Sequence, residues 1–354
     1  MHFGLNMECD YLQGRSEQDA FDDVFAQADM AEAVGIDSVW LAERHFAPSG
    51  GAGQPSIASA PIVLATAIAA RTRRIRVGTG VYVLPLNHPV RIAEEVATLD
   101  YVSQGRFALG VGRSGFTTAY EGYGYDYGES RARLQECLDI LVKAWTQERF
   151  SHTGTYYQLH DVCVTPKPLQ KPHPPIYMAA TTSESFPIAG QAGRHLFVGV
   201  RRTSVEGVKQ SVQTYRQVWR EAGHAGHGDV TLRLPVYVAQ IRAQAIADPE
   251  ASTMRYYRRL ADSLTRSVGR SGTSANEDRA RLAQELDNVT YDKLLRDWVV
   301  YGTPAEVAER LHQLIEELDL SGVIVEMNAG GLIPSAKVLQ SVRLFGEAVV
   351  PCFR

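Results

Sequence analysis

Cysteine is scarce in this 354-residue sequence, and none of its four cysteines forms a CxxC pair with another. Because such pairs supply the ligands of zinc knuckles and the dithiols of redox motifs, their absence argues against both kinds of site. Widely spaced cysteines are typical of proteins that stay reduced, so we expect a cytoplasmic location. The four are Cys9, Cys137, Cys163 and Cys352.

A strong net charge and a long apolar run are also missing. The formal net charge is −4, which gives no reason to expect binding to nucleic acid or to an acidic membrane. The most apolar stretch, residues 57–70, contains Ser59 and Pro61 and is too short to span a bilayer. The first seven residues lack a basic segment followed by an apolar run, so no signal peptide is expected.

A metal site is not predicted either. His224 and His227 have a spacing that resembles that of metal ligands, but they lie in a glycine-rich stretch with no third ligand nearby. A solvent-exposed loop accounts for both histidines, and no metal is assigned.

What the sequence does contain is an alternation of short apolar stretches with helical patterns. Alternation of this kind predicts an α/β fold with a parallel sheet, and eight such units suit a (β/α)8 TIM barrel that forms a single domain over residues 1–354. A doubly wound open sheet is the structural alternative. The expected strands cover residues 2–7, 38–42, 76–84, 106–112, 175–180, 195–200, 232–239 and 322–327.

Two segments interrupt the alternation. Residues 150–170 predict a hairpin excursion, and residues 244–300 predict a polar, helical, lid-like insertion whose Gly- and Ser-rich part, residues 267–276, should be mobile. Elsewhere we expect a helix from Ser56 to about Ala70 and a loop over residues 116–127.

The glycines after the fourth expected strand admit two readings. Gly110-Val-Gly112-Arg-Ser-Gly115 matches the G-x-G-x-x-G of dinucleotide-binding folds. However, the following residues read as a loop, no acidic residue ends a second strand at the right spacing, and the motif follows the fourth strand, not the first. Close approach of the backbone to a planar ligand or a phosphate explains these glycines better, with Arg113 as an anion clamp.

Hydroxyl side chains follow the fifth expected strand, at the start of a helix. Thr181, Thr182, Ser183 and Ser185 could simply cap that helix, or they could bind a phosphate together with its free N–H groups. Because Arg113 follows the neighbouring strand, a shared phosphate site is favoured.

Titratable side chains follow the second expected strand. His45 lies beside Glu43 and Arg44, where a histidine can donate or accept a proton near neutral pH. A loop histidine held by a carboxylate is an equally good interpretation of this pattern. His88, which precedes Pro89, is better explained as the start of a helix.

Four stretches together resemble the bacterial luciferase-like flavin-dependent monooxygenase family, over nearly the whole chain. They are Val39-Trp-Leu-Ala-Glu-Arg-His-Phe46, Val77-Gly-Thr-Gly-Val-Tyr-Val-Leu-Pro-Leu-Asn-His-Pro-Val-Arg91, Glu94-Glu-Val-Ala-Thr-Leu-Asp100 and Gly105-Arg-Phe-Ala-Leu-Gly-Val-Gly-Arg113. The resemblance implies a (β/α)8 barrel that receives reduced FMN (FMNH2) from a separate NAD(P)H:flavin reductase. It also implies O2 as co-substrate, a small organic substrate, and a homodimer packed through the second and third barrel helices.

The resemblance assigns site residues by position. It implies that Arg113, Thr182 and Ser185, with Thr181 beside them, hold the FMN phosphate. It places a non-prolyl cis peptide under the flavin ring at Gly80–Val81. Glu43 and His45 are expected to face the flavin. The resemblance thus implies catalytic roles for Glu43, Arg44 and His45. It implies cofactor binding by Gly80, Val81, Gly112, Arg113, Thr181, Thr182 and Ser185.

Two positions depart from the light-emitting members of that family. Arg44 stands where they have a catalytic histidine, and Gly112 stands where they have a cysteine near the reactive flavin carbon. These changes put light emission in doubt, while a C4a-(hydro)peroxyflavin remains compatible with the sequence. We expect Gly112 to leave room above the flavin ring and Arg44 to stabilise a developing oxyanion or peroxide.

The sequence therefore predicts an FMNH2- and O2-dependent monooxygenase. The first alternative uses the deazaflavin F420 for hydride transfer on the same barrel, and the second is a non-catalytic flavin-binding partner subunit. The organic substrate is not identified, because its specificity should reside in loops, chiefly residues 47–54, 116–127 and 244–300.

Overall fold

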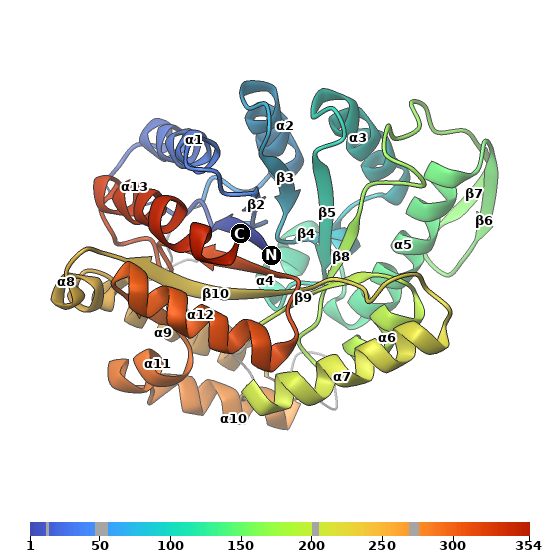
Figure 1. Cartoon of the computed structure of the whole chain (residues 1–354). Helices are drawn as coiled ribbons and strands as arrows, with labels where there is room; N and C mark the ends of the chain where they lie inside the picture. Colours follow the sequence, from blue (N-terminus) through green and yellow to red (C-terminus); the bar gives the residue numbers. More distant parts are fainter. Residues whose placement is uncertain (12–13, 47–55, 200–204, 269–275) are drawn as a thin grey trace.

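The computed structural model describes residues 1–11, 14–46, 56–199, 205–268 and 276–354. Eight parallel strands form a closed barrel, because β9 pairs with β10 and β12 pairs with β1. This closure confirms the predicted (β/α)8 barrel and excludes an open sheet (Figure 1). In order around the barrel the strands are β1 (His2–Met7), β2 (Ser38–Leu41), β3 (Arg76–Thr79), β5 (Phe107–Gly112), β8 (Ile176–Ala179), β9 (His195–Val198), β10 (Val230–Val238) and β12 (Gly322–Glu326).

Helices surround this barrel (Figure 1). Local signals start several of them: Ser16 and Asp19 form a capping box at α1, and Thr303 and Glu306 form another at α12, which has Pro304 at its first position. The helices that alternate with the barrel strands are α1 (Glu17–Ala33), α2 (Pro61–Arg71), α3 (Pro89–Val102), α5 (Ser130–Thr146), α6 (Ser185–Gln191), α7 (Val205–Glu221), α12 (Pro304–Leu318) and α13 (Ser335–Leu344).

The Trp40 side chain lies inside the barrel. Its ring packs edge-on against Tyr177 and Phe197, and its indole N–H donates to the Ser38 hydroxyl at 2.7 Å. A Cβ atom on Gly78 would lie 2.3 Å from the Trp40 ring, so this position needs glycine. Because aromatic rings block the centre, any ligand must bind above them, at the carboxyl ends of the strands.

Three local predictions need correction. The helix expected from Ser56 begins at Pro61, since the Ser56 hydroxyl donates to the carbonyl of Glu8 and Ser56 itself bridges to Asp10, just after β1. Residues 116–127 are not all loop: they contain α4 (Thr117–Tyr123), whose fully buried Tyr120 fixes a short helix that has too few turns to show periodicity. The third expected strand is divided into β3 and β4 (Tyr82–Val83).

Two further pieces lie outside the barrel. An antiparallel hairpin, β6 (Phe150–Thr153) with β7 (Gln158–Val162), projects at one side of the molecule (Figure 1). After β10 come α8 (Arg242–Ala247), α9 (Glu250–Ser267), α10 (Asn276–Asp287), α11 (Tyr291–Asp297) and the short strand β11 (Val300–Gly302). Most of the segment expected to be mobile, residues 269–275, lies outside the described residues.

The helices after β10 have an apolar cluster of their own, to which Tyr257, Leu264 and Leu286 contribute. The Ser252 hydroxyl fastens α9 to the barrel by donating to the carbonyl of Ala329 at 2.7 Å and accepting from the N–H of Leu332 at 2.9 Å. No helix within the described ranges combines the length and the apolar composition needed to cross a membrane.

Candidate active site at the carboxyl ends of the strands

The Gly80–Val81 peptide connects β3 to β4 at the carboxyl end of the barrel, and it is cis. This confirms the cis geometry that was predicted at this position, while its contact with a flavin stays a prediction. Val81 lies against Gly112, since a Cβ atom on Gly112 would be 2.7 Å from the Val81 Cγ2 atom. The Val81 side chain therefore occupies the space next to Gly112 on this side, while the expected room above a flavin ring stays a prediction.

The predicted phosphate ligands follow two neighbouring strands. β5 pairs with β8, so Arg113 and Thr181 leave adjacent strand ends. The Arg113 guanidinium donates to the Ser130 hydroxyl at 3.2 Å, at the first residue of α5. The Thr182 and Ser185 hydroxyls are 3.0 Å apart just before and at the start of α6. These side chains thus gather at one side of the barrel mouth.

An ion pair connects the starts of α5 and α6. Arg131, next to Ser130, contacts Glu184, next to Ser185, at 2.6 Å. Of the predicted phosphate ligands, Thr181 is exposed, whereas Thr182 and Ser185 are half-buried. The arrangement offers a guanidinium and several hydroxyl groups, which is the donor set that a phosphate monoester requires.

Glu43 and His45 form a buried pair. The His45 Nε2 atom lies 2.6 Å from Glu43 Oε1, and the other carboxylate oxygen accepts from the N–H of Val83 at 2.6 Å. With Nε2 donating to the carboxylate, Nδ1 is left to accept from the Tyr123 hydroxyl at 3.2 Å. Both ring nitrogens of His45 therefore have partners, and its tautomer is fixed by them.

A cavity of about 180 Å³ borders the Glu43–His45 pair, between the starts of α2 and α3. Tyr82 and Glu95 also line it, and burial raises the pKa of both groups, with a further contribution from Glu43 in the case of Tyr82. The predicted orientation of Glu43 and His45 toward a flavin stays a prediction.

Arg44 does not join its sequence neighbours. Its guanidinium contacts the carboxylates of Glu8 and Asp10 and lies over the ring of Phe116. Burial lowers the pKa of Arg44, but the two carboxylates outweigh that effect and hold the pKa above its ordinary value. Arg44 is thus a cation that is already shared between two anions, not an isolated positive charge.

Arg44 belongs to a chain of six alternating charges at the barrel mouth, which we call the ion-pair chain. Arg233 contacts Glu8 and also Glu326, the latter at 2.9 Å, while Arg259 of α9 contacts Asp10 at 2.8 Å. The members of the ion-pair chain, in order of contact, are Glu326, Arg233, Glu8, Arg44, Asp10 and Arg259.

Sequence reasoning missed most of the ion-pair chain. Arg233 is also the guanidinium that reaches the cis peptide, with Nη1 3.4 Å from the carbonyl oxygen of Gly80. The signal that could have revealed it is a charged residue inside an apolar strand, since Arg233 stands between Leu232 and Leu234, and Glu326 ends β12. Within the described part of the chain, no group of His, Cys, Asp and Glu side chains is arranged to hold a metal ion.

Comparison with known proteins gives a consistent result. A profile of the family described as luciferase-like monooxygenase matches residues 1–320. The oxygenase component of a flavin-dependent trigonelline monooxygenase from Acinetobacter baylyi is 27% identical over 248 residues, which cover 69% of this chain and 67% of that protein.

Two further proteins are similar over more of the chain. An F420-dependent glucose-6-phosphate dehydrogenase from Kineococcus radiotolerans is 30% identical over 295 residues, which cover 81% of each chain. The crystal structure of a monooxygenase from Streptomyces bottropensis superposes with a TM-score of 0.84 and 25% identity, covering all of both chains.

Proposed function

The chain belongs to the luciferase-like monooxygenase family, and we propose that it is the oxygenase component of a two-component system. It binds FMNH2 delivered by a separate NAD(P)H:flavin reductase and uses O2 to oxygenate a small organic substrate. The observation that carries this proposal is the Gly80–Val81 cis peptide, which lies at the same end of the barrel as Arg113 and the Thr182 hydroxyl. The similarity to a protein named as an oxygenase component supports it.

The residues at the barrel mouth fit FMN. Arg113, Thr181, Thr182 and Ser185 supply the charge and the hydroxyl groups that bind its phosphate. Gly80 and Gly112 present backbone without a side chain, and the cis peptide joins Gly80 to Val81, so a planar ring can approach the backbone closely here. When bound, the reduced flavin supplies the electrons that activate O2.

The polar residues that follow β2 have separate roles in this proposal. His45, held by Glu43 and Tyr123, is the residue to which we assign proton transfer. Arg44 acts electrostatically through the ion-pair chain, since its contact with Glu8 fixes the carboxylate that Arg233 shares. We assign Glu43 the role of orienting His45.

The experiment that tests the function is oxygen consumption by the purified chain supplied with FMN, NADH and a flavin reductase. We expect consumption above that of the reductase alone, and further stimulation by a suitable substrate. Hydride transfer with F420 that proceeds without O2 would contradict the proposal. This second candidate is favoured by one observation, the 30% identity to an F420-dependent dehydrogenase.

A non-catalytic flavin-binding partner subunit is the remaining alternative. The presence of the Glu43–His45 pair in addition to Arg113 and Thr182 argues against it, because a subunit that only binds flavin has no need of a pair for proton transfer. Turnover by this chain together with a flavin reductase, with no second oxygenase subunit present, separates the two possibilities.

We further propose a homodimer that packs through α2 and α3. Val63 of α2 and Tyr101 of α3 are large apolar side chains with 70% and 51% exposure, as expected of residues that a partner covers. Sedimentation analysis tests this proposal. The four free cysteines support a reducing, cytoplasmic setting for the reaction.

A further inference from the structure

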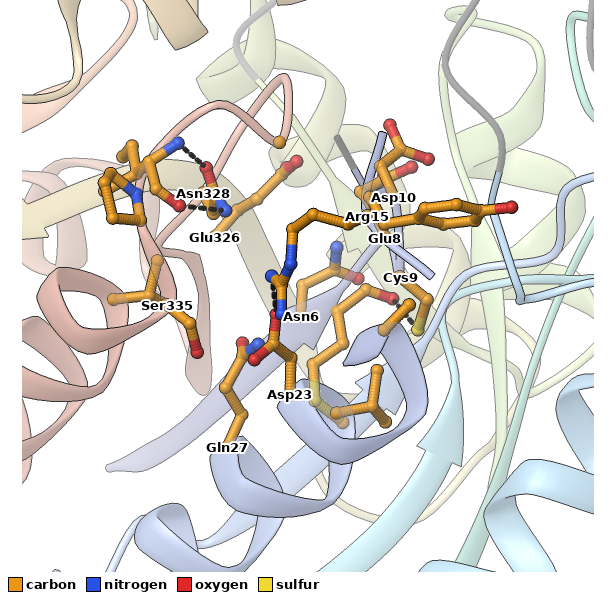
Figure 2. Close-up of a pocket in the computed structure, with 18 residues that line it drawn as sticks. Asn6, Glu8, Cys9, Asp10, Arg15, Asp23, Gln27, Glu326, Asn328 and Ser335 are labelled. Atoms are coloured by element: carbon orange, nitrogen blue, oxygen red, sulfur yellow. Dashed lines mark hydrogen bonds and ion pairs between the residues drawn. The ribbon is translucent and has the colours of Figure 1, made fainter. Parts of the chain in front are cut away.

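A cavity of about 280 Å³ lies between the ends of β1 and β12 and the helices α1 and α13 (Figure 2). Its volume is slightly below the range of typical ligand pockets, so it suits a small molecule. Its lining includes the side chains of Asn6, Glu8, Asp10, Glu326 and Asn328. Three of these, Glu8, Asp10 and Glu326, belong to the ion-pair chain.

Asn6 is the unusual member of this lining. It is only 3% exposed, and among the described residues neither its amide nitrogen nor its amide oxygen has a hydrogen-bond partner. Buried polar groups are nearly always hydrogen-bonded, because leaving one unpaired forfeits its hydration without replacement. Figure 2 shows the Asn6 side chain among the residues around the cavity. An unpaired amide of this kind can bind a ligand that has both a hydrogen-bond donor and a hydrogen-bond acceptor.

The Asn6 carboxamide is also close to the cis peptide. A Cβ atom built on Gly80 would lie 3.3 Å from the Asn6 oxygen, and Arg233 Nη1 lies 3.4 Å from the Gly80 carbonyl oxygen. The Nε atom of Arg233 is itself buried without an acceptor. Unpaired donors and an unpaired acceptor therefore flank the peptide on which we propose the flavin ring lies.

The charge balance around the cavity favours an uncharged guest. The ion-pair chain has three carboxylates and three guanidinium groups, each contacting a group of opposite charge. Arg15 and Asp23, on the opposite wall, form a further pair. A charged guest would enter this buried site without a counter-ion, which is strongly unfavourable.

Building on the function proposed above, we infer that this cavity holds the organic substrate and that Asn6 determines its specificity. The substrate is a small, uncharged compound with a hydrogen-bond donor beside an acceptor, such as a carboxamide or a lactam. Such a group pairs with both atoms of the Asn6 amide. A long-chain aldehyde or alkane fits poorly, because the cavity is small and such a compound leaves the Asn6 amide unpaired.

Binding to the full chain without flavin tests this inference apart from turnover. The probes are four compounds of similar size: benzamide, benzoate, benzylamine and toluene. In isothermal titration calorimetry, benzamide should bind about tenfold more tightly than the other three compounds. A tenfold difference in affinity corresponds to the free energy of one to two neutral hydrogen bonds. In Asn6→Leu, which has a similar volume, the affinity for benzamide should fall by about tenfold, while that for toluene should not fall.

Thermal unfolding provides a second readout. Asn6→Leu replaces an unpaired buried amide by an apolar group, so its Tm should rise by a few degrees as benzamide binding weakens. Asn328 is the matched control, because it lines the same cavity but its amide is bonded to both the N–H and the carbonyl of Ile333. Asn328→Leu should lower the Tm.

Several results would overturn the inference. If benzoate or benzylamine binds as tightly as benzamide, the cavity tolerates a charged guest. If benzamide shows no saturable binding at millimolar concentration, the cavity is not a binding site for this class of compound. A lower Tm in Asn6→Leu would identify Asn6 as a structural residue. A parallel loss of FMN affinity would assign its amide to the cofactor. Failure of oxygen consumption alone would instead contradict the proposed reaction.

Discussion

At the scale of single residues, Arg113 should determine most of the affinity for the cofactor phosphate. Arg113→Met removes a charge-assisted hydrogen bond and should weaken FMN binding by about 1.5–3 kcal/mol, or roughly 10- to 150-fold. Titration monitored by flavin fluorescence measures the change. Arg131→Met is the control, because Arg131 lies close by but contacts only the exposed Glu184 among the described ion pairs. Equal affinities for the two variants would contradict the assignment.

His195 should make the stability of the barrel depend on pH. Burial lowers its pKa from 6.5 against an opposing effect of Asp229, and its Nδ1 atom accepts from the Asp229 N–H at 3.0 Å. The unfolded chain therefore binds a proton at a higher pH than the folded chain does. Consequently the free energy of unfolding should decrease as the pH falls below 6.5 toward the lowered pKa.

Denaturant unfolding from about pH 7.5 to about pH 5.5 tests this dependence. In His195→Asn, whose side chain accepts a hydrogen bond but does not titrate, the decrease should be smaller. His160→Asn, at an exposed position of β7, should leave the profile as it is. If His195→Asn has the profile of the unchanged protein, His195 is not the group responsible.

At the scale of the elements, the Ser252 hydroxyl is one of the groups that attach α9 to the barrel. Ser252→Ala leaves the carbonyl of Ala329 and the N–H of Leu332 without this partner, so unfolding should become easier by about 1–3 kcal/mol. Denaturant titration measures the loss. Ser211→Ala is the control, since its hydroxyl donates only within α7, to Gly207, and its loss should matter little.

The attachment of α9 also positions a charged residue at the mouth of the barrel. Arg259 of α9 contacts Asp10, so the helices after β10 contribute one end of the ion-pair chain. A loss of stability in Ser252→Ala that is no larger than in Ser211→Ala would indicate that apolar packing alone positions α9.

At the scale of the whole molecule, the reaction should yield oxygenated product without strong light. Arg44 and Gly112 stand at the positions where the resemblance implies a histidine and a cysteine for light emission, and Arg44 is paired with Glu8 and Asp10 instead. Luminometry of the chain with FMNH2, O2 and decanal should give emission near background. Bright emission would show that these two positions are dispensable for light.

The sequence by itself determined the barrel and the polar residues that follow its fourth and fifth strands, where we propose that a phosphate binds. Strands are recognisable because apolar periodicity is a local property, and eight of them alternating with helices leave few arrangements that bury every apolar face. Motif resemblance predicted the cis peptide at Gly80–Val81. The rule that parallel strands end at one edge predicted that Arg113 and Thr182 lie at the same end of the barrel. The start of α2 and the helix α4 were mispredicted, because side-chain contacts override weak local patterns there.

Only the tertiary structure decided which charges meet. Glu8 and Arg233 are 225 positions apart in the sequence, yet they are in contact because the barrel closes. The separation of Arg44 from His45, the unpaired amide of Asn6 and the cavity beside it depend on the same closure. Such contacts join residues that share no local pattern, so their energies enter only when distant strands pack, and no property of the individual segments reveals them.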